Sequence, residues 1–189
     1  MTLFRTVDPA AEPVTLAEVK AHLRLDHDSE DDLLNGLIRA AREDVERAAG
    51  LALIEQSWRL ALDNWPRDGC VAVPLHPVRT ILSVTAYGSE GEGSLIDPAS
   101  YEVDTMSRPA RLHFDGPPGV LRTLNGIEID FTAGFGEAGP DVPDLLRRAI
   151  ILLAAHWYEF RTSYGPNDQP VSYPAGYDRM IASYRRGRL

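Results

Sequence analysis

The periodicity of apolar residues changes twice along this chain, and this change limits the fold more than any other feature. Helical spacing holds near the N-terminus and again from Leu145 to about Phe160, whereas short β-prone runs fill the segment between them. Helical segments adjoin both ends of the β-prone segment, so we expect a β unit inserted between helices. The pattern predicts an α+β protein, with a helical bundle body and an inserted small antiparallel β unit.

Two helices are expected before the β-prone segment. Thr15 and Glu18 have capping-box spacing and open a short helix that ends near Leu25. A second helix follows Ser29, and Gly50 supplies its stop. The apolar residues of this second helix fall on one stripe, which requires a partner helix. The stripe consists of Leu33, Leu34, Leu37, Ile38, Ala41 and Val45.

The central segment contains six short β-prone runs separated by turns rich in proline and glycine. The expected strands are 58–62, 70–73, 81–87, 101–103, 111–114 and 127–131. The segment from Gly88 to Gly93 lacks the spacing of a phosphate-binding loop, and its two glutamates would repel phosphate. We therefore expect a hairpin tip there.

The most apolar helix is expected from Leu145 to about Phe160, after an acidic N-cap and an early proline in the segment 141–144. It is apolar on most faces, which is typical of a central core helix. A loop rich in glycine and proline follows, then a short helix from Tyr177 to Tyr184 and a basic end. The expected organisation is N-terminal helices over 1–54, the β unit over 55–135, the core helix over 136–162 and an extended C-terminal arm over 163–189.

Composition excludes several classes of protein. The formal net charge of −9 argues against a protein that wraps DNA, because such a protein needs a basic surface. The single cysteine, Cys70, allows neither an intrachain disulfide nor a cysteine-based zinc site. The longest apolar run, 149–155, has seven residues, against the roughly 20 that a membrane span requires.

The acidic segment 26–32 is the sharpest candidate for metal binding. As an EF-hand loop it fails, because Asp31 stands where glycine must make the turn and Leu37 where a bidentate glutamate should close the site. Acidic residues in a first helical turn are also stabilised by the helix dipole. We favour this second interpretation and leave a weak divalent-ion site as the alternative.

Aromatic residues gather in the C-terminal third, and two interpretations are open for them. They suit either an interface or the edge of a core. The set is Trp157, Tyr158, Phe160, Tyr164, Tyr173, Tyr177 and Tyr184. The tail has too few aliphatic residues to fold alone, which favours an arm lying on another surface. His156, inside an apolar helix, is expected to be a hydrogen-bonded core or interface residue.

Three stretches carry a further signal in chain order: Val14–Arg24 with the acidic residues after it, Phe131–Gly136 with Ala149–Arg161, and Tyr173–Arg185. Together they resemble the head–tail connector, or adaptor, proteins of long-tailed phages, a family also present in gene transfer agents. The stretches span nearly the whole chain. The departures from the family pattern are Phe135 for tyrosine, Phe160 for a polar residue, and Met180-Ile181 for paired leucines.

The resemblance implies a structural adaptor and not an enzyme, with no cofactor. Such a protein assembles with itself into a ring of about twelve copies under the portal. The ring surrounds the DNA exit channel, and DNA passes through it without sequence-specific binding. A stopper or tail terminator protein is expected on the tail side. The protein would lie at the neck of a virion or phage-like particle, after assembly in the bacterial cytoplasm.

The resemblance also implies roles for particular residues. The portal-binding arm would contain Tyr177, Met180, Ile181, Tyr184, Arg185, Arg186 and Arg188. The subunit interface or core would contain His156, Trp157, Tyr158 and Arg161.

Two alternative functions stay open at this point. One is another neck ring protein, such as a tail terminator. The other is a metal-dependent hydrolase, for which His22, His76, His113 and His156 would have to lie within ligand distance of one another.

Overall fold

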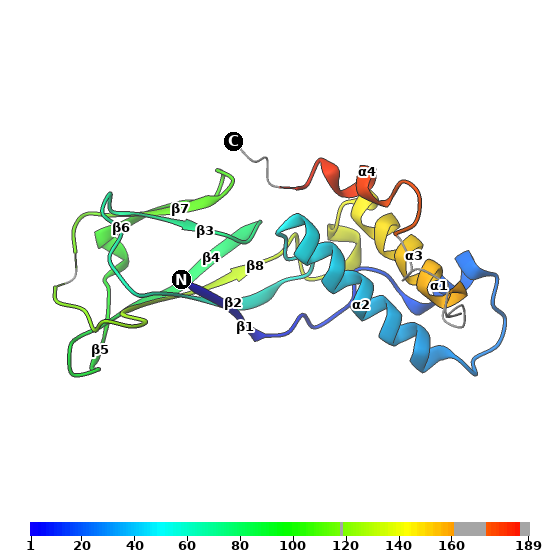
Figure 1. Cartoon of the computed structure of the whole chain (residues 1–189), viewed down its shortest axis with the longest axis horizontal. Coiled ribbons are helices and arrows are strands. Elements are labelled where there is room, and N and C mark those ends of the chain that lie inside the picture. The colour runs from blue at the N-terminus through cyan, green and yellow to red at the C-terminus, as the bar shows by residue number, and fades with distance from the viewer. Residues whose placement is uncertain (118, 161–172, 186–189) are drawn as a thin grey trace, which may run out of the picture. The chain divides into compact units, whose positions relative to one another are not determined.

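A computed structural model of the chain describes residues 1–117, 119–160 and 173–185. Two compact units are present (Figure 1): Met1–Ala10 with Glu55–Phe135, and Ala11–Ile54 with Gly136–Leu189. The expected class is confirmed, since the chain mixes helices with antiparallel sheets. The first ten residues differ from the expected organisation, because a strand there joins the β unit.

The β unit contains two antiparallel sheets. The larger has the order β1 (Thr2–Val7), β2 (Gln56–Leu62), β8 (Ile127–Ala133), β4 (Val78–Tyr87) and β5 (Gly93–Leu95). The smaller has the order β3 (Cys70–Val73), β7 (Ala110–Phe114) and β6 (Tyr101–Asp104), which follows a short 3-10 turn at Pro98–Ser100. Figure 1 shows the smaller sheet as a second layer beside the larger one.

Strict alternation along β8 sets the two faces of the larger sheet. Ile127, Ile129 and Phe131 are buried, whereas Glu128 and Asp130 between them are partly exposed. Leu60 of β2 and Val84 of β4 both lie opposite Ile129 in the register, so these strands bury the same face. In the smaller sheet, β7 buries every second residue in the same way.

All six expected strands are present, with ends that differ by a few residues. The segment 88–92 makes the expected hairpin tip, because Tyr87 pairs with Gly93 across it. Sequence reasoning missed two strands, β1 and β5. β5 is only three residues long and contains a glycine and a serine, so pairing with β4 and not local preference makes it a strand.

The second unit is helical, with α1 (Leu16–Leu23), α2 (Asp31–Ala49), α3 (Asp144–Glu159) and α4 (Tyr177–Ala182), and a 3-10 turn at Gly139–Asp141 before α3. α2 packs against α3, and α1 and α4 each contact both of these helices. The fully buried side chains between them include Val19, Leu34, Ile38, Val45, Leu146, Ile150 and Leu153.

The helix ends follow the expected signals in part. Thr15 forms the expected capping box, with the Glu18 amide donating to its hydroxyl at 3.2 Å. Gly50 ends α2 with a φ of 68°, which suits glycine. The start of α2 differs from expectation, since Glu30 is the N-cap and makes no side-chain cap. Ser29 instead forms a 2.9 Å hydrogen bond with His27 Nδ1.

A buried ion network stabilises the helical unit. Arg42 is only 3% exposed, and its guanidinium donates to Glu12 at 2.9 Å and to Glu46 at 2.8 Å. The second carboxylate oxygen of Glu46 accepts a hydrogen bond from the Leu53 amide at 2.8 Å. Through Glu12, the network joins the segment before α1 to α2, and through Leu53 it joins the segment after α2 to the same helix. Each buried charge in the network has a partner of opposite charge.

No helix in the described ranges is long and apolar enough to span a membrane.

Candidate interaction surfaces

The C-terminal helix α4 lies on the helical unit and does not extend away from it. Tyr177 is 1% exposed and Ile181 is fully buried, against α2 and α3. The expectation of an extended arm is therefore wrong for residues 177–182. The physical reason is that Tyr177 and Ile181 supply enough apolar area to hold one short helix on a preformed surface. Figure 1 shows α4 beside α3.

Asp44 of α2 is the polar anchor of this contact. The Tyr177 hydroxyl donates to Asp44 Oδ2 at 2.8 Å, and the Tyr173 hydroxyl donates to Oδ1 at 3.1 Å. Arg47 adds a contact to Oδ1 at 2.5 Å. The two tyrosine rings stack, with centroids 4.9 Å apart. Burial, together with the hydrogen bond to Asp44, raises the pKa of the Tyr177 phenol, and the same causes raise the pKa of Tyr173.

The remaining residues expected at the portal contact differ in accessibility. Met180 and Tyr184 are half-buried, whereas Arg185 is exposed and forms a 2.6 Å ion pair with Asp178. Arg186 and Arg188 lie outside the described residues. Among the described residues of the expected set, Arg185 has the most exposed side chain.

The residues expected at a subunit interface or core lie at the end of α3. His156, Trp157 and Tyr158 are all half-buried. The His156 ring contacts the Phe160 ring at a centroid distance of 4.6 Å, and the Tyr158 hydroxyl donates to Glu30 just before α2. Arg161 lies outside the described residues. The contacts within this unit leave part of each side chain accessible.

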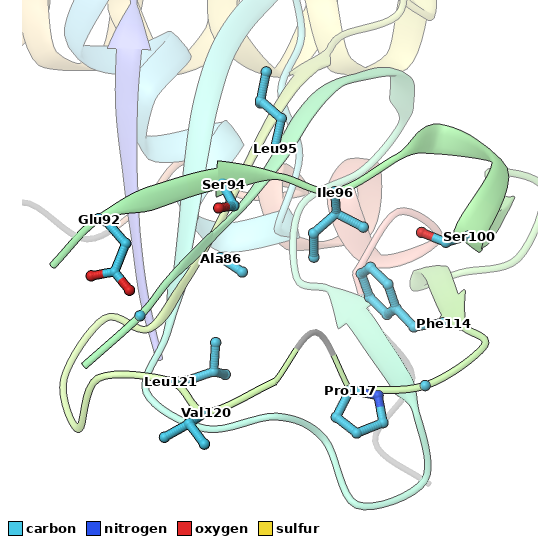
Figure 2. Close-up of a pocket in the computed structure, with 12 residues that line it drawn as sticks. Ala86, Glu92, Ser94, Leu95, Ile96, Ser100, Phe114, Pro117, Val120 and Leu121 are labelled. Carbon is cyan, nitrogen blue, oxygen red and sulfur yellow. The ribbon is translucent and has the colours of Figure 1, made fainter. Parts of the chain in front are cut away.

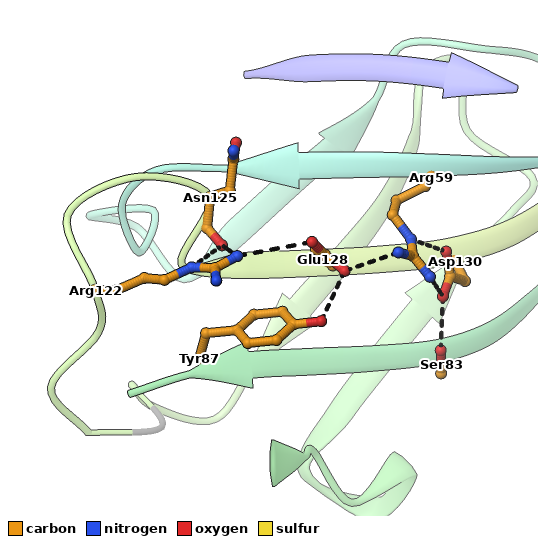
Figure 3. Close-up of polar contacts among 7 residues, drawn as sticks. All are labelled: Arg59, Ser83, Tyr87, Arg122, Asn125, Glu128 and Asp130. Atoms are coloured by element: carbon orange, nitrogen blue, oxygen red, sulfur yellow. Dashed lines mark hydrogen bonds and ion pairs between the residues drawn. The ribbon is translucent and has the colours of Figure 1, made fainter. Parts of the chain in front are cut away.

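A polar network covers the outer face of the larger sheet, and Figure 3 shows it across three strands. Arg59 of β2 donates to Asp130 of β8 through Nε at 2.6 Å and Nη2 at 2.9 Å. Ser83 of β4 donates to the same carboxylate at 3.3 Å. Glu128 lies 3.1 Å from Arg59. The hydrogen bond to Asp130, followed by the nearby carboxylate charges, raises the pKa of Arg59.

The network continues to the end of β4. The Tyr87 hydroxyl donates to Glu128 at 2.9 Å, and this hydrogen bond raises the pKa of the phenol. The Arg122 guanidinium lies 4.0 Å from the centroid of the Tyr87 ring and donates to the Asn125 carbonyl. Sequence reasoning missed this network, although the alternation of Glu128 and Asp130 with buried residues was a signal for it.

A pocket of about 460 Å³ opens at the β5 end of the same unit. Figure 2 shows the side chains of Ile96, Phe114 and Leu121 around it. β5 forms one side, and the segment before β8 forms another. Ile96 is fixed there by a hydrogen bond from its amide to the Val84 carbonyl at 2.8 Å. Polar groups of Glu92, Ser94 and Ser100 share the lining with these apolar side chains.

The acidic segment before α2 is paired with the single lysine of the chain. Lys20 Nζ lies 2.5 Å from Asp28 and 2.8 Å from Asp31. Asp31 and Asp32 occupy the first turn of α2. Within residues 1–117, 119–160 and 173–185, no group of three or more histidine, cysteine or acidic side chains could hold a metal ion.

The family model of the phage gp6-like head-tail connector proteins matches residues 13–107, which is just over half of the chain. The chain belongs to this family. The match covers α1, α2 and the strands from β2 to β6, so it includes parts of both units of the connector. No match was found among curated protein sequences.

Solved structures extend the comparison to the whole connector. Its chain is similar to one in the neck of an empty GTA particle computed with C6 symmetry, with 28% identity and a TM-score of 0.85. It is also similar to one in the virion of a native gene transfer agent (GTA) particle, with 29% identity and a TM-score of 0.84. A third, in the neck of a native GTA particle computed with C12 symmetry, has 28% identity and a TM-score of 0.81.

Each of these three similarities covers 100% of the connector and 97% of the other chain. They therefore include the C-terminal third, which lies outside the family match. The expected identity as a head–tail connector is confirmed, and the family and the similar structures are structural components of particles.

Proposed function

We propose that the connector is one subunit of a ring at the neck of a phage or phage-like particle, where it joins the head to the tail. The observation that carries this proposal is the similarity over the full chain to subunits of GTA necks computed with C6 and C12 symmetry. The similarity includes both compact units of the chain. This supports a role for the whole chain, and not for one unit alone, as a subunit of such a ring.

The ring contains twelve copies, the number that the C12 symmetry of one similar neck supports. Each copy presents two different surfaces to its neighbours, as every closed ring of more than two copies requires. The helical unit acts as the bundle body of the subunit. Its buried ion network and its fully buried side chains, such as Ile38 and Leu153, support the view that this unit is rigid within the ring.

The C-terminal end faces the portal, and a stopper or tail terminator binds the opposite side of the ring. The exposed guanidinium of Arg185, with the basic residues 186 and 188 after it, supports an electrostatic contact in an otherwise acidic protein. DNA passes through the ring without sequence-specific binding, because a net charge of −9 opposes close contact with phosphates. The function is therefore geometric and not catalytic.

Deletion of the coding sequence in a producing strain, followed by complementation, tests this function. Particles without the connector should have heads and tails that do not join, and the wild-type gene should restore joined particles. Electron microscopy of negatively stained particles gives the ratio of tailed to tailless heads. Normal tailed particles in the deletion strain would refute the proposed function.

A further inference from the structure

We infer that the pocket beside β5 receives an arginine or lysine side chain of the tail-side neighbour in the neck. This inference rests on the proposed function, because it assigns a site on the connector to one of the proteins that this function requires.

The walls of the pocket combine apolar and polar groups. Ile96, Phe114 and Leu121 supply apolar surface around a volume of about 460 Å³ (Figure 2). Glu92 and Ser94 supply a carboxylate and a hydroxyl. A side chain that fits these walls has an apolar stem and a polar head. Lysine and arginine are built in this way, because an aliphatic stem precedes the charged group.

The pocket carries a negative charge that is not neutralised. Among the described residues that line it, Glu92 alone is charged. Its carboxylate makes no ion pair or hydrogen bond with the part of the chain that the structure describes. Gly88 leaves room for this carboxylate on the pocket wall, since a Cβ at that position would lie 1.9 Å from Glu92 Oε1. An unpaired carboxylate beside apolar surface favours a cationic partner.

Two cations of the same unit are already engaged. Arg122 lies 3.8 Å from Glu128, and Arg111 pairs with Asp104 at 2.7 Å. The segment 88–107 carries five acidic residues and no lysine or arginine. Its field attracts a basic partner and repels the phosphates of DNA. The fitting occupant is therefore a basic side chain of a protein.

The rim of the pocket supports a protein contact. Leu95 is 76% exposed and Val120 is 82% exposed, and both belong to the lining. Burial of such side chains against a partner gains about 25 cal/mol for each Å² of apolar surface covered. The same contact excludes water from the ion pair between Glu92 and the incoming cation, which strengthens the pair.

The tail-side protein is the neighbour that fits this pocket. The portal contact is assigned to the C-terminal end, which belongs to the helical unit, whereas the pocket belongs to the β unit. A second copy of the connector, with a net charge of −9, would bring further negative charge to an acidic surface. A different protein with a basic segment avoids this repulsion.

Photo-cross-linking in assembled particles tests the inference. The photoreactive amino acid p-benzoylphenylalanine replaces Val120, and purified particles are irradiated. The expected product joins the connector to the tail-side protein, and mass spectrometry should place the link within a few residues of an arginine or lysine. The matched control puts the same amino acid at Met106, which is 92% exposed but lies outside the pocket lining. This control should give no such product.

Charge reversal adds a functional measurement. Glu92→Lys should reduce the yield of tailed particles about tenfold or more, because it places like charges together in the pocket. Glu90→Lys makes the same change of charge in the same hairpin but outside the lining, so it should change the yield less than about twofold. Changing the cross-linked basic residue of the tail-side protein to glutamate should restore the yield with Glu92→Lys.

The outcomes separate the inference from the function. Joined particles in which position 120 cross-links only to the portal, to another connector copy or to nothing would overturn the inference and leave the proposed function intact. Equal yields for Glu92→Lys and Glu90→Lys, with unchanged thermal unfolding of both, would also overturn it. Failure of the proposed function would instead appear as normal tailed particles in the deletion strain.

Discussion

The hydroxyl of Tyr177 donates a 2.8 Å hydrogen bond to Asp44, although 133 positions separate these residues in the chain. This contact joins α4 to α2 and makes a segment near the C-terminus part of the folded core. Tyr173 and Arg47 contact the same carboxylate, so the charge of Asp44 is well satisfied although it is buried. One acidic side chain of α2 is therefore the polar anchor of α4, beside the apolar burial of Tyr177 and Ile181.

Replacing Tyr177 with phenylalanine tests this anchor. The variant keeps the ring but removes a buried donor to a charged acceptor, so the free energy of unfolding should fall by about 2 kcal/mol. Urea unfolding followed by circular dichroism measures it. Tyr173→Phe is the matched control: it removes a longer hydrogen bond at a more exposed residue, and it should cost less. Equal losses for the two variants would contradict the account.

Alkaline pH should weaken the same contact. The pKa of Tyr177 is raised in the folded chain by burial and then by the hydrogen bond to Asp44, whereas the unfolded chain has the ordinary value of about 10. The contribution of Tyr177 to the free energy of unfolding is therefore constant below pH ~10. It falls above that pH, because the unfolded chain then releases the phenol proton more readily than the folded chain. Unfolding free energies between pH 9 and 11, measured for wild type and Tyr177→Phe, should converge as pH rises. Parallel curves would disprove this explanation.

Arg42 should be among the most sensitive positions in the helical unit. Arg42→Met removes the cation between Glu12 and Glu46 and leaves two acidic groups without their shared partner. The loss of unfolding free energy should be about 3 kcal/mol or more. Arg39→Met is the control, because Arg39 is exposed on the same helix and should change stability by less than about 0.5 kcal/mol. A small effect of Arg42→Met would show that the network contributes little.

The outer face of the larger sheet should show measurable coupling between Arg59 and Asp130. A double-mutant cycle with Arg59→Met and Asp130→Asn should give an interaction energy of about 1 kcal/mol, since the contact is bidentate but partly exposed. Equilibrium unfolding of the four proteins provides the measurement. An interaction energy near zero would mean that water replaces the contact at no cost.

The C-terminal charges should control attachment to the portal. Reversing Arg185, Arg186 and Arg188 to glutamate should abolish portal attachment without lowering the unfolding free energy, because an exposed ion pair such as Arg185–Asp178 contributes little. Pull-down with the portal protein measures attachment. Truncation after Gly176 is a poorer test, since it also removes the buried side chains of Tyr177 and Ile181. Unimpaired attachment of the reversed variant would contradict the role of the arm.

Local chemistry made part of this fold predictable. Thr15 and Glu18 cap α1, and Gly50 stops α2, because each signal depends on residues a few positions apart. The strands with strict alternation, such as β8, were also predictable, since one buried face is visible in the sequence.

Features that depend on distant partners were not predictable. β1 is a strand because β2 pairs with it, and the two are about fifty residues apart. The pairing of Asp44 with Tyr173 and Tyr177 leaves no local signal either, because nothing near Asp44 in the sequence distinguishes it from a solvated acidic residue.

The measurement that tests the central claim most directly is a cryo-electron microscopy reconstruction of the neck of particles that contain this connector. A closed ring of copies next to the portal is expected, with α4 on the portal side. A neck whose density next to the portal cannot be fitted by either unit of this chain would contradict it.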